Sequence, residues 1–160
     1  LREKNYVMSY FNSLFGYGSI NNKLSQYLRE ENGMCYQTYS LFQKQDNLLI
    51  VYAGIDYENK DACVKLVGKA LKEMQQGKFT DEEIMATKKT LVNQINTSMD
   101  NQTSILDNYL FHNLIDSPLL SERLKEITTV TKEEIVTLAN KIKLNTIYLL
   151  GGSNVKKTND

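Results

Sequence analysis

Arg29 and Tyr36 are the two side chains of this sequence whose types and spacing suggest chemistry. Arg29 lies near the end of a helical pattern, and Tyr36 follows seven residues later at the start of a strand pattern, with Gly33 between them. Glycine suits the left-handed position after a helix, so the chain can reverse sharply and bring both side chains near one sheet edge. A fixed cation beside a phenolic donor can hold a peptide carbonyl or stabilise an oxyanion. The alternative is that Arg29 is a solvated helix residue.

Other residues that could do chemistry are few. His112 is the only histidine, and Cys35 and Cys63 lie far apart without metal-ligand spacing, so we predict no metal site on this chain. A cysteine nucleophile would need His112 beside Cys35, and nothing in the sequence places them together. The "GYG" at residues 16–18 is too short for a phosphate loop and predicts a tight turn.

Composition limits the class of protein. The chain has 160 residues, 41% of them apolar, which is enough for one domain with a real core. Its 19 basic and 19 acidic residues balance. We therefore expect no nucleic-acid partner, although a nucleic-acid-binding α+β module remains an alternative that a salt-sensitive interaction would revive. Two cysteines fit a reduced compartment, although they could also pair.

The sequence also gives expectations about the location and the source of the protein. No stretch of about 18 apolar residues is present and no signal peptide is recognisable, so we expect no membrane association and a cytoplasmic location. The chain begins at Leu1 inside a charged stretch, and we expect it to be an excised piece of a longer protein. Its abundance of Asn, Lys and Ile suggests a bacterial, AT-rich genome.

The first half of the chain predicts two helices and a hairpin. Helical spacing of apolar residues indicates a helix over residues 5–15 and a second over 19–31, with Ser19 as its cap. Alternating and β-branched residues over 34–42 and 47–55 indicate an antiparallel hairpin. The expected apolar stripe of the second helix is Ile20, Leu24, Tyr27 and Leu28. The residues expected to share one strand face are Met34, Tyr36, Thr38, Ser40 and Phe42.

The second half predicts several helices and a closing strand. Thr80 with Glu83, and Thr131 with Glu134, have the spacing of capping boxes at two helix starts. Further helices are expected near residues 103–114 and 120–127, and "NTIYLLGG" at 145–152 as a strand. The fold class is therefore α+β: one domain over residues 1–152 with helices on one face of a mostly antiparallel sheet, and a polar tail at 153–160. Three strands are few for this length, so we expect the first strand or strands to be missing.

The residues around the glycine turn resemble a known family. "FGYGSINNKLSQYLREENGMCYQTYS" is similar to the non-zinc half-domain of the pitrilysin/insulinase family of zinc metallopeptidases, which includes the mitochondrial processing peptidase. The matching places are Leu14-Phe15-Gly16, Lys23-Leu24, Leu28-Arg29-Glu30, Gly33-Met34 and Tyr36. The likeness continues through the later helices to about residue 152.

The resemblance implies a role in a two-half enzyme. Family members pair two homologous halves around a chamber for unfolded peptides, and the zinc-bearing half would be in the same chain or in a partner subunit. Arg29 would hold the peptide substrate, and Tyr36 would donate a hydrogen bond to its scissile carbonyl, so both would be auxiliary catalytic and substrate-binding residues. The chain itself would carry no cofactor, with zinc in the complementary half. The glycine-rich turn at 16–18 is much shorter than the processing peptidase's substrate loop.

The resemblance leaves a second role open. This chain lacks the zinc motif, so it should be inactive alone, and some family pairs have lost zinc altogether. The alternative to a substrate-binding half is a catalytically inactive scaffold or partner subunit with no zinc in the assembly. The presence of both Arg29 and Tyr36 favours the first reading.

Overall fold

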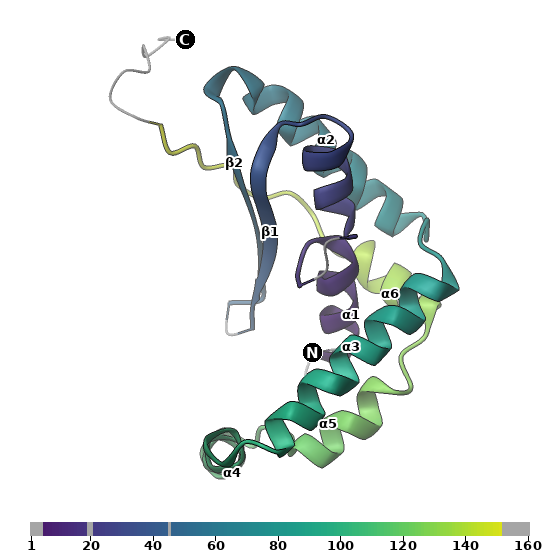
Figure 1. Cartoon of the computed structure of the whole chain (residues 1–160), viewed down its shortest axis with the longest axis vertical. Helices are drawn as coiled ribbons and strands as arrows, with labels where there is room; N and C mark the ends of the chain where they lie inside the picture. The colour runs from purple at the N-terminus through teal and green to yellow at the C-terminus, as the bar shows by residue number, and fades with distance from the viewer. Residues whose placement is uncertain (1–4, 19–20, 45, 152–160) are drawn as a thin grey trace.

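A computed structural model describes residues 5–18, 21–44 and 46–151 of the chain. The elements are, in order, α1 (Asn5–Phe15), the π-helix η2 (Ser25–Glu30), β1 (Cys35–Gln43), β2 (Leu48–Ile55), the 3-10 turn η3 (Tyr57–Asn59), α2 (Lys60–Gln75), α3 (Asp81–Met99), α4 (Gln102–Ile115), α5 (Leu120–Ile127) and α6 (Lys132–Ala139). The two strands form an antiparallel sheet, and the helices lie on one side of it (Figure 1). The expected α+β class, with helices on one sheet face, is confirmed.

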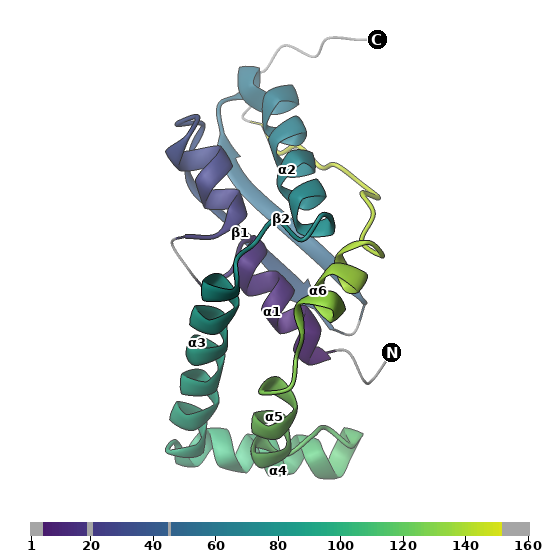
Figure 2. The same cartoon turned by 90° about the vertical axis from the view of Figure 1, so that its right-hand side faces the viewer.

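Helix α1 is the centre of the core. It contacts β1, α2, α3, α5 and α6, and Figure 2 shows it running between the hairpin and the later helices. Helix α1 is buried around most of its circumference, its polar Asn12 and Ser13 as well as its apolar residues. Its buried apolar residues are Val7, Met8, Tyr10, Phe11, Leu14 and Phe15.

A buried polar contact fixes α1 against β1. The Ser40 hydroxyl donates to Asn12 Oδ1 at 2.6 Å, and the Ser40 N–H donates to the Gly16 carbonyl at 3.1 Å. A Cβ added at Gly16 would lie 2.5 Å from Leu24 Cδ1 and 2.7 Å from Ser40 Oγ, so only glycine allows this approach. Glycine in the turn predicted at 16–18 is therefore needed for close packing at Gly16, as well as for the positive φ at Gly18.

Both predicted capping boxes are present. Thr80 and Glu83 exchange side-chain and backbone hydrogen bonds at the start of α3. Thr131 and Glu134 do the same at the start of α6. These contacts satisfy N–H groups that the first turn of a helix leaves unpaired, which explains why α3 and α6 begin where they do.

The hairpin has one covered face and one open face. The pairs Ser40–Val51 and Phe42–Leu49 lie toward the helices. The alternate pairs Tyr39–Tyr52 and Leu41–Ile50 point the other way, and the two tyrosine rings stack at 5.0 Å. Apolar side chains on this open face remain 40–48% exposed: Leu41, Leu48, Ile50 and Tyr52. The hairpin therefore carries apolar side chains on both of its faces, as a strand pair covered on both sides would, although the helices cover only one face.

The predicted closing strand at 145–152 is wrong within the described residues. Residues 142–151 have no regular secondary structure, and Tyr148 and Leu150 are 83% and 84% exposed. A strand is stabilised by a hydrogen-bonded neighbour, and no described strand pairs with this segment. The sequence pattern is that of a strand, but its partner is not among the described residues.

Some sequence predictions lie outside the described residues. These are the Ser19 cap, Ile20 of the apolar stripe and the polar tail at 153–160. Within the described ranges, no helix combines the length and the apolarity needed to cross a bilayer.

The close contact at Gly16 predicts that substitution by alanine has opposite effects on stability at Gly16 and at Gly68. Gly16→Ala should lower the free energy of unfolding by about 1–3 kcal/mol, because its methyl group meets Leu24 and the backbone of Ser40. Gly68→Ala, within α2, is the matched control: its Cβ meets nothing within 4 Å, so it should raise stability by about 0.5–1 kcal/mol. Urea unfolding of the three proteins measures both changes, and equal effects would contradict this account of Gly16.

The buried Tyr10 phenol predicts a loss of stability at alkaline pH. It donates to the Ile127 carbonyl at 2.8 Å, and burial raises the pKa of Tyr10 from 10.0 to about 12. Because folding favours the neutral phenol, this contribution is complete below pH 10 and is lost as the pH rises toward 12. Tyr10→Phe should reduce this decline and cost about 1 kcal/mol at neutral pH. Urea unfolding across this pH range tests it, with Tyr36→Phe as the exposed control.

Candidate functional site

The short helix η2 holds Arg29 at its end. Asn22 Oδ1 accepts a hydrogen bond from the Ser25 N–H at 2.8 Å, and the backbone is helical from Lys23. Asn22 therefore caps this helix, and because residues 21–22 are not helical, the predicted start at residue 19 is too early. The predicted apolar stripe is buried where it is described, at Leu24, Tyr27 and Leu28. Burial of this stripe leaves Arg29 in the last turn, pointing to the partly exposed side.

The reversal after η2 uses Gly33 as predicted, and Asn32 with it. Gly33 adopts the left-handed conformation with φ 58°, and its N–H donates to the Arg29 carbonyl at 3.0 Å. The Asn32 side chain donates to the Tyr27 carbonyl at 2.7 Å, and the Met34 N–H donates to the Leu28 carbonyl at 2.7 Å. These bonds satisfy the last carbonyls of the helix and direct the chain into β1.

Tyr36 lies in a β-bulge at the start of β1. Cys35 pairs with Ile55 and Thr38 pairs with Ala53, so Tyr36 and Gln37 together face one residue of β2. The extra residue shifts the alternation of side chains. The prediction that Tyr36 shares a face with Thr38, Ser40 and Phe42 is therefore wrong. Cys35 takes the buried position, and the Tyr36 side chain is 95% exposed.

The signal for this bulge is present in β2. The residue opposite Tyr36 and Gln37 is Gly54, inside an otherwise apolar and β-branched strand. A glycine in a strand interior often marks a bulge or a close backbone approach. The apolar and β-branched pattern of this segment predicts a regular strand, and Gly54 is the residue that indicates the irregularity.

Both candidate side chains reach the surface, and they do not bind one another. The Arg29 Nη2 atom lies 3.2 Å from Glu30 Oε1, and this ion pair is about half exposed, with side-chain exposures of 40% and 48%. The Tyr36 hydroxyl makes no hydrogen bond to any described residue. The arrangement offers a guanidinium and a free phenolic donor near the η2–β1 turn. Neither group is sealed inside the core.

The two cysteines are buried free thiols rather than a disulfide. Burial raises the pKa of Cys35, which the nearby Arg29 guanidinium partly opposes. Burial and the neighbouring Cys35 raise the pKa of Cys63. A raised thiol pKa disfavours the thiolate, which is the nucleophilic and metal-binding form. Both residues act as small apolar side chains of the core.

The described residues contain no group of three or more His, Cys, Asp or Glu side chains that could hold a metal ion. His112 lies in α4, where its Nδ1 is 2.8 Å from the Ser117 carbonyl oxygen. This contact holds the end of α4 to the connection that follows it. The histidine is therefore a structural residue here, far along the chain from Cys35 and without any contact to it.

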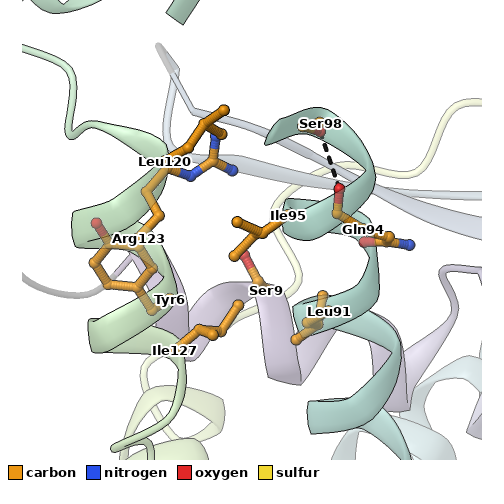
Figure 3. Close-up of a pocket in the computed structure, with 9 residues that line it drawn as sticks. All are labelled: Tyr6, Ser9, Leu91, Gln94, Ile95, Ser98, Leu120, Arg123 and Ile127. Atoms are coloured by element: carbon orange, nitrogen blue, oxygen red, sulfur yellow. Dashed lines mark hydrogen bonds between the residues drawn. The ribbon is translucent and has the colours of Figure 1, made fainter. Parts of the chain in front are cut away.

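A cavity of about 230 Å³ lies between α1, α3 and α5, away from η2 and β1 (Figure 3). Its lining residues are Tyr6, Ser9, Leu91, Gln94, Ile95, Ser98, Leu120, Arg123 and Ile127. Arg123 is the one charged side chain in this lining, and the Gln94 amide points away from the space. Burial raises the pKa of Tyr6, with Arg123 lowering it and Glu126 and Glu122 raising it. Glu126 and Glu122 thus act on the same phenol as Arg123, although neither carboxylate lines the cavity.

Comparison with known proteins places this architecture among peptidase relatives. Residues 2–91, more than half of the chain, match the family model of the peptidase M16 inactive domain. The chain is 30% identical over 150 residues to the probable inactive metalloprotease YmfF of Bacillus subtilis, with 92% of this chain and 34% of that protein covered.

Solved structures with a similar fold include relatives of the same kind. A conserved protein from Enterococcus faecalis V583 has a TM-score of 0.80 and 27% identity, covering 86% of this chain and 32% of that one. A peptidase M16 inactive domain from Pseudomonas fluorescens shares the fold, with a TM-score of 0.75, 21% identity, and coverage of 89% and 34%. The chain thus spans about a third of the length of these relatives. The resemblance seen around Arg29 and Tyr36 is confirmed: this chain belongs to the peptidase M16 inactive-domain family.

Proposed function

We propose that this chain is the non-catalytic half-domain of a peptidase-M16-type assembly, and that it serves as a scaffold for a homologous partner half. The observation that carries the proposal is the match of residues 2–91 to the inactive domain. The Bacillus subtilis relative, itself named a probable inactive metalloprotease, supports the same role. The partner half would belong to the same longer polypeptide or to a second subunit.

The hairpin supports a scaffold role. Its open face carries apolar side chains that are 40–48% exposed, and contiguous exposed apolar surface often marks an interaction site. Neither strand of the hairpin contains a charged residue, in β1 from Cys35 to Gln43 or in β2 from Leu48 to Ile55. An uncharged apolar surface of this kind suits the wall of a shared chamber or the contact between two halves.

A second candidate function is the gripping of a peptide substrate by Arg29 and Tyr36. The bulge favours it, because this irregularity keeps the Tyr36 phenol in solvent rather than in the core, and bulges often re-aim a side chain at a functional site. In that role the Arg29 guanidinium would bind the substrate backbone and the phenol would donate to its carbonyl. Zinc and the attacking water would then come from the partner half.

Metal analysis separates the two functions. We expect the purified assembly, this chain with its partner half, to contain far less than one zinc ion and to leave unstructured peptides uncleaved. Elemental analysis gives the zinc content, and a fluorogenic peptide of unfolded sequence gives the turnover. One zinc ion per assembly together with peptide cleavage would overturn the scaffold role.

Substitutions at the two candidate residues give an independent test. Because both side chains are exposed, Arg29→Ala and Tyr36→Phe should change the free energy of unfolding by less than about 0.5 kcal/mol. In a scaffold they should also leave the affinity for the partner half unchanged. In a substrate-gripping half they should reduce peptide turnover roughly ten- to a thousandfold. Tyr57→Phe and Lys60→Ala, at other exposed positions, are the matched controls.

A further inference from the structure

Asn32 and Gly33, in the turn between η2 and β1, form a dipeptide that can react with itself. Asn32 is the one asparagine of the sequence that stands directly before a glycine, and both residues are exposed. The backbone nitrogen after an asparagine can attack the side-chain amide carbon, and closeness within one molecule speeds such a reaction. Glycine favours the attack most, because it has no Cβ to hinder the approach. Asparagine is accordingly one of the thermolabile residues.

The reaction has two balanced steps. The Gly33 nitrogen forms a bond to Asn32 Cγ, the bond from Cγ to Nδ2 breaks, and Nδ2 takes up the Gly33 proton and leaves as ammonia. The cyclic imide that results is then opened by water at either of its carbonyl carbons. One opening gives aspartate at position 32, and the other gives isoaspartate, in which the main chain runs through the side-chain carbon. Water is the only co-reactant, and the new carboxylate adds a negative charge.

The closed turn holds both reacting groups in hydrogen bonds. The Gly33 N–H donates to the Arg29 carbonyl at 3.0 Å, so the proton that must leave is bound there. Asn32 Nδ2 donates to the Tyr27 carbonyl at 2.7 Å, which holds the side-chain amide against the end of η2. Attack requires the nitrogen to release its proton and the side chain to swing toward it, so both bonds must open. The turn therefore protects the dipeptide while it is closed, and a local opening exposes it.

The product cannot rebuild the closed turn. A carboxylate only accepts hydrogen bonds, so at position 32 the donor to the Tyr27 carbonyl would be lost and oxygen would face oxygen. The new charge would also follow Glu30 and Glu31 directly, at the C-terminal end of η2, and this end of a helix disfavours anions. Isoaspartate would lengthen the main chain by one carbon, which displaces the N–H groups of Gly33 and the next residue from their helix carbonyls.

We propose that the Asn32–Gly33 turn is a deamidation site, which is protected while the turn is closed, reacts when it opens, and is then kept open by its own product. Arg29 and Tyr36 lie on either side of this turn, so the modification frees their relative position irreversibly. The site is independent of the scaffold role, because it depends only on chemistry within this chain and on water. The fraction of modified molecules records how often the turn has opened.

Mass spectrometry of peptides from the purified protein, incubated either folded or in urea, tests the site and its protection. We expect aspartate and isoaspartate at position 32 in both samples, with a rate about tenfold or more slower in the folded protein.

Asn140, at the end of α6, is the matched control within the same chain. Its Nδ2 donates to the Val136 carbonyl at 2.9 Å. The next N–H, of Lys141, donates to the Leu138 carbonyl at 2.9 Å. Asn140 thus has the same kind of contacts as Asn32, but a lysine follows it in place of glycine. We expect Asn140 to react about tenfold or more slowly than Asn32 when both are unfolded, because the lysine side chain hinders the attack.

Hydrogen exchange tests whether the opening of the turn controls the reaction. Exchange of the Gly33 amide proton needs the same N–H to be released, so folding should slow exchange and deamidation by factors within about tenfold of each other. Asn32→Asp, which reproduces one product, should speed exchange at Gly33 and Met34 about tenfold or more, because both N–H groups donate to carbonyls of η2. Asn113→Asp is the matched control. The Asn113 side chain also donates to a helix carbonyl, that of Tyr109 in α4, and its substitution should leave exchange at the turn unchanged.

Several results would overturn the proposal. These are an intact Asn32 in the unfolded chain, equal rates in the folded and unfolded chains, and equal rates at Asn32 and Asn140. A mismatch between the two protection factors, or unchanged exchange at Gly33 and Met34 in Asn32→Asp, would also do so. Circular dichroism checks that both variants are folded, and the rates in the unsubstituted protein test the site without any variant.

Discussion

The close contact between the end of α1 and the middle of β1 holds the two parts of the fold together. Gly16 has no side chain, so Leu24 and Ser40 can pack directly against its backbone. The Ser40 hydroxyl also satisfies the Asn12 amide oxygen, which would otherwise be a buried polar atom without a partner. Through this contact α1 positions the hairpin on one side, while its other sides support the later helices.

Most of the fold could be predicted because its determinants are local. The spacing of apolar residues marks the helices, and the side chains of Thr80 and Thr131 mark where α3 and α6 begin. The hairpin strands begin within one residue of their predicted positions. The prediction of a strand at 145–152 was wrong for a non-local reason. A strand needs a hydrogen-bonded neighbour, and its own sequence does not show whether one is present.

The candidate site could be predicted in part. The helix end, the left-handed Gly33 and the position of Arg29 in the last turn follow from local sequence, whereas the exposure of Tyr36 depends on the bulge. The bulge could not be predicted from the sequence of β1. Its residue types alternate as they would in a regular strand, even though one extra residue is inserted. The orientation of α4 was equally hidden: periodicity identifies a helix, but only tertiary contacts, here the hydrogen bonds of Asn108 to Pro118 and Leu120, show that Asn108 faces inward.

The bulge also makes the exposed phenol easy to lose. Removing one residue at positions 36–37, a single-codon deletion, would restore regular pairing with β2, and the side chain before Thr38 would then alternate normally. The hairpin could survive such a deletion while Tyr36 moved onto the open face of the sheet or disappeared. A lineage could therefore abandon any contact made by this tyrosine in one genetic step, without first losing the domain that carries it.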